Sequence, residues 1–180
     1  MNKLLIIMIF VVFISGCTTK DDAQLAVTNY LDSYINNDEI ILRELKKFVD
    51  QEQLTAGQKD LYKSLLKRQY HDLKYEIVNI EYIDNDAVIA VDIVVYDYYK
   101  AQKMASEYLE TNPSIFTNPT GEYDANVFLE YKLNLMNTTT YTNQYSLDIL
   151  VTKKNGKWYV NQPTKITLEK IHGIYNYEHQ

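Results

Sequence analysis

The chain is poor in the residues from which most catalytic and metal-binding motifs are built. Among its 180 residues are one cysteine, three histidines, three prolines and five glycines. A single cysteine excludes a disulfide within the chain, and five glycines leave little room for a phosphate-binding loop. His71, His172 and His179 are not spaced as ligands of one zinc ion. We therefore expect no metal, no cofactor and no catalytic residue from the common hydrolase or nucleotide-binding motifs.

An excess of positive charge is also absent. The formal net charge is −6, and it becomes −7 when residues 1–16, with one basic residue and no acidic one, are set aside. An acidic chain gains nothing from a polyanion, so we expect no nucleic-acid partner. One basic stretch, Lys59, Lys63, Lys67 and Arg68, has helical spacing. It is either the solvated face of a helix or a contact for lipid headgroups or wall polymer.

The longest apolar run lies at the N-terminus. Residues 4–14 are apolar throughout, about eleven residues, whereas a membrane-spanning helix needs roughly 20. Two small residues and the only cysteine follow, in the order Ile14-Ser15-Gly16-Cys17. This order resembles a bacterial lipobox. The resemblance implies that residues 1–16 are a lipoprotein signal peptide and that the Cys17 sulfur carries a diacylglyceryl group. An ordinary secretory signal with a chance cysteine and an uncleaved anchor are the alternatives.

The lipobox resemblance also implies a location. One acyl chain binds a membrane weakly, whereas a diacylglyceryl group supplies two chains at one residue. Residues 17–22 would then be the lipidated cysteine and a short polar linker. We expect a protein that is lipid-anchored to the extracytoplasmic face of the cell membrane. Its expected partners are the membrane, through the lipid on Cys17, and a protein of the cell envelope.

Apolar residues at helical spacing predict three helices before the first strand, at residues 22–36, 38–49 and 55–70. The third opens with Thr55-x-x-Gln58, a capping box. Two further helices, at about residues 97–110 and 124–136, are predicted on either side of an irregular loop at 111–123. Residues 164–172 are either a short helix that ends at Gly173 or an extended segment.

Alternation of apolar and polar residues predicts two β-hairpins. The first joins residues 73–83 to 87–96 through Asp84-Asn85-Asp86, and a change of phase predicts a bulge near Ile77. The second joins residues 141–151 to 157–161 around Asn155-Gly156, a pair that favours the positive φ of a tight turn.

This order of elements predicts a single α+β domain over residues 23–180. N-terminal helices would pack on a curved, mainly antiparallel sheet, with a helical insertion at about 97–137 between the two hairpins. Together with the run Lys154-Asn155-Gly156-Lys157-Trp158-Tyr159-Val160, this order resembles the NTF2-like, cystatin-like superfamily. The resemblance implies that the helices pack into the sheet to make a cone. The insertion is longer than the usual connection of that superfamily, so closure of the cone stays an open question.

The candidate binding residues depend on the state of the cone. If it is open, Tyr141, Tyr145 and Trp158 would line it and bind a ligand; otherwise they are core residues. Asp92 and Asp148 each interrupt a β-rich run. A carboxylate inside an apolar cone would be a base with a raised pKa, but their positions opposite the apolar alternation indicate that both face water.

Three functions are compatible with these features. The first is a membrane-anchored lipoprotein that binds a ligand or a protein partner without catalysis, and the superfamily resemblance and the missing catalytic motifs favour it. The second is an isomerase-like or dehydratase-like enzyme that uses a carboxylate in the cone. The third is an assembly or exclusion factor without a pocket. A filled cone and an exposed apolar patch on the insertion would be the signature of the third.

Overall fold

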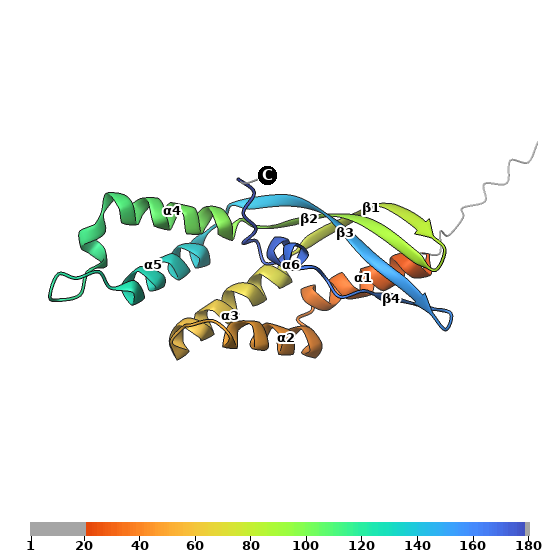
Figure 1. Ribbon diagram of the computed structural model, residues 1–180, viewed down its shortest axis with the longest axis horizontal. Coiled ribbons are helices and arrows are strands. Elements are labelled where there is room, and N and C mark those ends of the chain that lie inside the picture. The colour runs from red at the N-terminus through yellow and green to blue at the C-terminus, as the bar shows by residue number, and fades with distance from the viewer. Residues whose placement is uncertain (1–20, 179–180) are drawn as a thin grey trace, which may run out of the picture.

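The computed structural model describes residues 21–178, so the predicted leader, Cys17 and most of the linker lie outside the described range. Within that range, helices pack against a sheet of four antiparallel strands in the order β1-β2-β3-β4. The sheet is twisted and curved, and helices lie against one face and beyond one end of it (Figure 1). The predicted α+β class is confirmed, and the arrangement is consistent with the NTF2-like, cystatin-like fold.

Three consecutive helices precede the sheet: α1 (Asp22–Ile35), α2 (Glu39–Asp50) and α3 (Ala56–His71). Asp21 caps α1 by accepting a hydrogen bond from the Ala23 amide. The predicted capping box is present at the start of α3: the Gln58 amide donates to Thr55 Oγ1, and the Thr55 amide donates to Gln58 Oε1. Local side-chain signals therefore define where these two helices begin.

The sheet consists of β1 (Lys74–Ile83), β2 (Asp86–Tyr96), β3 (Thr142–Lys154) and β4 (Lys157–Val160). The β1–β2 register shifts between Ile77 and Asn79, at the predicted bulge. The hairpins turn at Asp84 and at Asn155-Gly156, which all have positive φ. Both predicted hairpins are confirmed, and their tips lie at the same end of the sheet (Figure 1).

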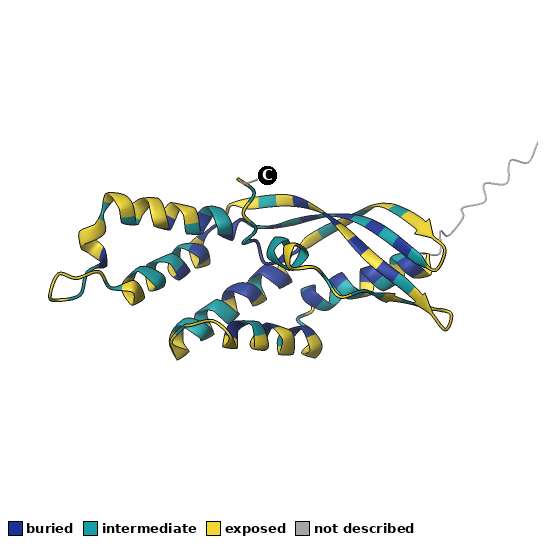
Figure 2. Ribbon diagram, in the orientation of Figure 1, coloured by how far each residue is buried: buried dark blue, intermediate teal, exposed yellow. Residues whose placement is uncertain are grey.

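The inner face of the sheet is covered by helix α1. Burial alternates along β2, whose buried side chains are Ala87, Ile89, Val91, Ile93 and Val95. Helix α1 contacts all four strands, and its Ala23, Val27 and Leu31 have no exposed surface. Figure 2 shows buried residues running along the centre of the sheet and on α1. Full burial of a Val, Leu or Ile side chain contributes about 1.5–3 kcal/mol, so this layer is a major source of stability, and it fills the cone.

The insertion between the hairpins consists of α4 (Tyr98–Thr111), the 3-10 helix η1 (Pro113–Phe116) and α5 (Ala125–Thr138). The two predicted helices are confirmed, whereas η1 lies in the predicted irregular loop. The insertion projects beyond the end of the sheet that is remote from the hairpin tips (Figure 1). A second, smaller core joins it to α3, and this core contains Leu65, Tyr98, Ala101, Leu133 and Met136.

The last helix, α6 (Lys165–Ile171), follows β4 and lies against β2. The helical alternative for residues 164–172 is therefore the correct one. Thr164 caps α6 by accepting a hydrogen bond from the Thr167 amide, and Gly173 follows the helix with φ +71°. Ile171 and His172 are buried. Helix α6 thus brings the C-terminal segment close to α2 and α3.

Candidate ligand-binding groove

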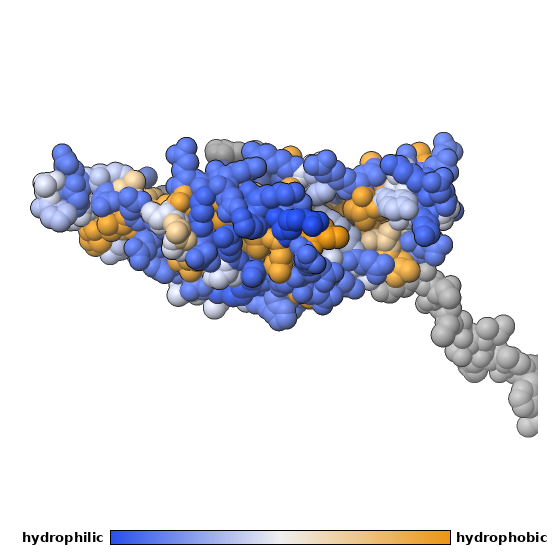
Figure 3. Space-filling view, turned by 90° about the horizontal axis from the view of Figure 1, so that it is seen from below, coloured by the Kyte–Doolittle hydropathy of each residue, from blue (hydrophilic) through white to orange (hydrophobic). Residues whose placement is uncertain are grey.

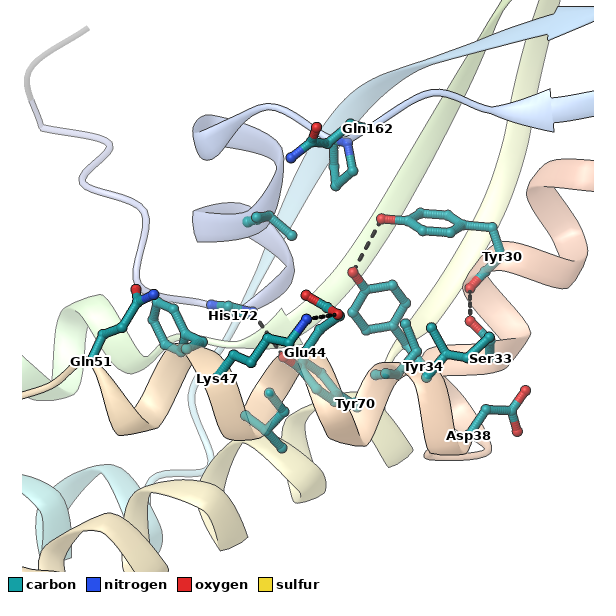
Figure 4. Close-up of a pocket in the computed structure, with 16 residues that line it drawn as sticks. Tyr30, Ser33, Tyr34, Asp38, Glu44, Lys47, Gln51, Tyr70, Gln162 and His172 are labelled. Atoms are coloured by element: carbon teal, nitrogen blue, oxygen red, sulfur yellow. Dashed lines mark hydrogen bonds and ion pairs between the residues drawn. The ribbon is translucent and has the colours of Figure 1, made fainter.

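A groove of about 730 Å³ lies between α1, α2 and α6. Helix α2 forms one wall with Ile41, Leu45 and Phe48, and α6 with the segment before it forms another through Pro163 and Leu168. Figure 4 shows Tyr30, Tyr70 and His172, which also line the groove, converging on it from elements far apart in the sequence. The groove lies outside the filled cone, because the inner face of the sheet is already covered by α1.

Aromatic rings form a continuous contact series along the floor of the groove. The rings of Tyr30 and Tyr34 meet edge to face at 5.3 Å between centroids, and those of Tyr34 and Tyr70 at 4.9 Å. The series continues to His172, whose ring lies 5.7 Å from Tyr70 and 4.9 Å from Phe48. Edge-to-face pairs of this kind add to the stability that burial provides. The aromatic rings therefore give the groove a mostly apolar floor, and their contacts with each other hold them in one arrangement.

The polar ends of these rings bind each other. The Tyr30 and Tyr34 hydroxyls are 3.1 Å apart, and the Tyr70 hydroxyl lies 2.8 Å from His172 Nε2. Burial raises the pKa of Tyr30 and Tyr70 and lowers the pKa of His172 to about 4. All of these groups are consequently neutral near pH 7. A ligand in the groove meets a neutral surface whose hydrogen bonds are already made.

Charged groups occur only at the rim of the groove. Asp38 and Glu44 are its lining carboxylates, and both are exposed. The Lys47 ammonium lies 2.9 Å from the Glu44 carboxylate, and its hydrogen bond lowers the pKa of Glu44. A general base at neutral pH needs a pKa raised toward 7, which is the opposite shift. The rim therefore suits orientation of a ligand better than proton abstraction.

The structure does not bring the three predicted binding residues together. Tyr145 is buried on the inner face of the sheet, where burial raises its pKa to about 12 and Asn143 donates to its hydroxyl. Tyr141 is 48% exposed, with Lys100 Nζ 3.8 Å from its ring centroid. Trp158 lies one register position from the Lys154–Lys157 pair that closes the second hairpin, and it contacts the ring of Tyr82. None of the three belongs to the lining of the groove.

The two aspartates considered as bases lie on the outer face of the sheet. Asp92 accepts hydrogen bonds from Ser146 at 2.6 Å and from Gln144 at 3.2 Å. Asp148 is exposed. Neither belongs to the lining of the groove. The predicted orientation of both carboxylates, away from the apolar alternation, is confirmed.

A buried carboxylate that the sequence reasoning did not single out is Asp97, which is 4% exposed. Its Oδ1 accepts from the Lys100 amide and its Oδ2 accepts from the Tyr177 hydroxyl at 3.0 Å. Both oxygens are thus engaged, one as the N-cap of α4 and one in holding the C-terminal segment. Its role is structural. The signal in the sequence was its place at the start of a predicted helix.

The residues of the groove were visible in the sequence only as parts of helix faces. Tyr30 and Tyr34 are four residues apart, which places them on one side of α1. Their contact with Tyr70 and His172 depends on packing between helices that are distant in the chain.

Among residues 21–178, no three His, Cys, Asp or Glu side chains are grouped so that they could hold a metal ion. Nor is any helix of that range long and apolar enough to cross a membrane.

Comparison with known proteins identifies no relative. No family model matches the sequence, and no curated protein and no solved structure matches it significantly.

Proposed function

We propose that this chain is a lipid-anchored protein of the extracytoplasmic cell envelope and that its domain binds an apolar ligand without catalysis. The observation that carries the binding proposal is the groove between α1, α2 and α6, with its aromatic floor and its charged groups confined to the rim. The ligand is either a small molecule with an apolar body or an apolar segment of an envelope protein.

The size and lining of the groove support binding. Sites for small ligands are concave, measure about 300–1,000 Å³ and are mostly apolar, with a few polar groups that orient the ligand. The volume of about 730 Å³ lies within that range. Lys47, Gln51 and Gln162 supply polar groups at the rim. Aromatic rings that are already fixed by contacts with each other lose little conformational entropy on binding, which favours affinity.

The N-terminal motif supports the anchor. Ile14-Ser15-Gly16-Cys17 places an aliphatic residue and two small residues before the sole cysteine, after an apolar run of signal-peptide length. Two acyl chains at Cys17 would provide stable attachment, which a single chain does not. The described domain needs no disulfide, because its sheet and helices enclose a large apolar core. The cysteine is therefore free for lipidation.

An isomerase-like or dehydratase-like activity is less well supported. Such chemistry needs a carboxylate with a raised pKa beside a hydroxyl donor in a cavity. In the groove the tyrosine hydroxyls bind one another or His172, and the exposed Glu44 has a lowered pKa. No specific observation favours the enzyme.

A photo-crosslinker in the groove wall tests the binding proposal. Ile40 lines the groove and is 64% exposed, so its replacement by p-benzoylphenylalanine leaves the core intact. Irradiation of native membranes should yield one defined adduct, whose mass identifies a small molecule or a protein. The matched control is the same replacement at Ile166, an exposed residue of α6 outside the groove lining, which should yield none. Absence of an adduct at Ile40 would contradict the proposal.

A second candidate, an assembly factor, is favoured by the insertion. The cone is filled, and the projecting α4–α5 insertion carries exposed apolar side chains that include Ile115 and Tyr123. Figure 3 shows hydrophobic residues over this end of the molecule. Exposed apolar patches of this kind often mark protein contacts. The crosslinker at Ile115 distinguishes the two functions, since an assembly factor should give a protein adduct there and none at Ile40.

A further inference from the structure

The first turn of α1 lies at the tips of both hairpins. The Tyr82 hydroxyl, near the end of β1, faces the Asp21 carboxylate and holds the pKa of that carboxyl below its usual value, and the nearby Lys153 ammonium of β3 acts in the same direction. The Tyr82 ring in turn lies 5.8 Å from that of Trp158 in β4. Figure 1 shows α1 beginning beside these tips, with the insertion at the opposite end of the long axis. The described chain therefore starts at one pole of an elongated molecule.

The stretch of chain between Cys17 and the start of α1 is short. Five peptide units separate Cys17 from Asp22, and an extended chain spans at most about 3.6 Å per residue, or about 18 Å in total. A lipid on Cys17 would hold the start of α1, which lies beside the hairpin tips, within that distance of the bilayer surface. The α4–α5 insertion would then point away from the membrane.

Apolar side chains lie on the outer face of the sheet at the same pole. The register places Ile83, Asp86, Thr152 and Tyr159 in one row across the four strands. Ile83 is 53% exposed and Tyr159 is 50% exposed, and Leu150, exposed as well, lies in the neighbouring row. Tyrosine is enriched where proteins meet lipid headgroups, because its ring is apolar and its hydroxyl is polar. This pole thus presents side chains that suit a lipid interface.

Two lysines extend this surface toward the tip. Lys154 and Lys157 lie directly opposite each other on β3 and β4, and like charges in that position destabilise a sheet. Neither forms an ion pair with any residue of the range 21–178. Long lysine side chains can place their stems along apolar surface and their ammonium groups among phosphates. Anionic headgroups would relieve the repulsion between the two ammonium groups.

We infer that the pole formed by the hairpin tips and the start of α1 rests on an anionic phospholipid surface, through Ile83, Tyr159, Lys154 and Lys157. This inference depends on the proposed lipid anchor. Asp21, Asp22, Asp84 and Asp86 lie at the same pole and outnumber its lysines, so the pole as a whole gains no net electrostatic attraction to the surface. The short tether compensates by keeping the surface at a high effective concentration near the bilayer. The contact therefore fixes the orientation of the domain, while the acyl chains supply the affinity.

The predicted basic face of α3 does not contribute to this surface. Lys59 donates to the Asp50 carbonyl, and Lys63 lies 3.5 Å from Asp60. Arg68 donates to the Asn137 and Thr139 carbonyls, so three of the four basic side chains of this stretch bind groups of the protein itself.

Site-directed spin labels test the orientation in the full-length, lipidated protein. The label is attached to Asn85→Cys at the hairpin tip or to Ile115→Cys on the insertion, both at exposed positions. The protein is reconstituted into vesicles of phosphatidylglycerol and phosphatidylethanolamine. Collision rates with a water-soluble nickel reagent should be several-fold lower for the Asn85 label than for the Ile115 label. Equal rates at the two positions, with the lipid present, would overturn the inference.

A double variant separates a specific contact from simple proximity. Ile83→Ser with Tyr159→Ser changes exposed side chains only, so the fold should survive. The Asn85 label should become as accessible as the Ile115 label, although the protein still sediments with the vesicles. The matched control is Ile115→Ser with Tyr123→Ser on the insertion, which should leave the Asn85 label shielded. Persistent shielding in the first variant would mean that the tether alone causes it, and the contact would be rejected.

The mass of the purified protein distinguishes failure of the anchor from failure of the contact. A chain that begins at Cys17 and carries a diacylglyceryl group agrees with the anchor. An unmodified cysteine overturns the anchor and, with it, the inferred contact. A lipidated chain with equally accessible labels overturns the contact alone.

Discussion

Replacement of Gly173 by alanine should destabilise the domain more than any other glycine substitution within the described chain. Gly173 follows α6 with φ +71°, and a Cβ there would overlap the Tyr96 carbonyl oxygen and the Gln69 side-chain amide. Gln69 is fully buried. Its Nε2 donates to the Tyr96 carbonyl at 3.1 Å and its Oε1 accepts from the Tyr96 amide at 2.9 Å. The added methyl group would therefore clash with the buried hydrogen bonds that join α3 to β2 next to the C-terminal segment.

The expected cost has two sources. A non-glycine residue in the left-handed region loses about 1–2 kcal/mol. Displacing the Gln69 amide breaks two hydrogen bonds and leaves buried polar groups without partners, which costs about 1–3 kcal/mol. Together these give about 2–5 kcal/mol, a large share of the roughly 5–15 kcal/mol that stabilises a typical domain.

Two other glycines provide matched controls, because alanine there meets no atom within 4 Å. Gly121 has φ +86°, so Gly121→Ala should lose only the backbone term of about 1–2 kcal/mol. Gly57 lies in the first turn of α3 without a positive φ, so Gly57→Ala should gain up to about 0.5–1 kcal/mol.

Urea unfolding of the purified variants measures these differences. The single tryptophan, Trp158, reports on the sheet by fluorescence, and circular dichroism reports on the helices. The order of midpoints should be Gly57→Ala, then wild type, Gly121→Ala and Gly173→Ala. If Gly173→Ala unfolds at the same urea midpoint as Gly121→Ala, a Cβ at position 173 does not disrupt the Gln69–Tyr96 hydrogen bonds, and the prediction is refuted.

Two further predictions concern pH and membrane attachment. Burial lowers the pKa of His172 from 6.5 to about 4, so the unfolded chain takes up a proton at higher pH than the folded chain does. The free energy of unfolding should therefore fall by at most about 3 kcal/mol as the pH drops from about 6.5 toward 4. His172→Gln should weaken this pH dependence. Equal pH dependence of the urea midpoints of wild type and variant would refute the role of His172. Cys17→Ala should leave the washed membrane fraction yet keep the melting temperature of the wild type, because Cys17 precedes α1. Retention of that variant in the membrane would indicate an uncleaved anchor.

Most of the secondary structure was predictable from local pattern. The alternation in residues 87–96 indicated the buried face of β2, and the capping box at Thr55 indicated the start of α3. The bulge near Ile77 was visible as a change of phase. Each of these signals depends on neighbours in the sequence, so no knowledge of packing was needed. The short helix η1 was missed, because its four residues are too few for a periodic signal.

The groove could not be predicted in the same way. Tyr30, Tyr70 and His172 come from α1, α3 and the end of α6, and nothing local relates them. The sequence pointed instead to Tyr141, Tyr145 and Trp158, which depended on an open cone. Helix α1 fills that cone, so Tyr145 is part of the core. Trp158 lies beside the turn of the second hairpin.

The sequence by itself determined the α+β class, the order of helices and hairpins, and the expectation of a lipid at Cys17, because periodicity, turn residues and a short linear motif express these locally. The tertiary structure alone decided where the groove lies, which rings line it and at which pole of the molecule α1 begins. Those properties arise when segments more than a hundred residues apart pack together, as the hydrogen bond between Tyr70 and His172 illustrates. A pattern within the chain carries no record of such contacts, since many side chains of similar size would satisfy the same pattern.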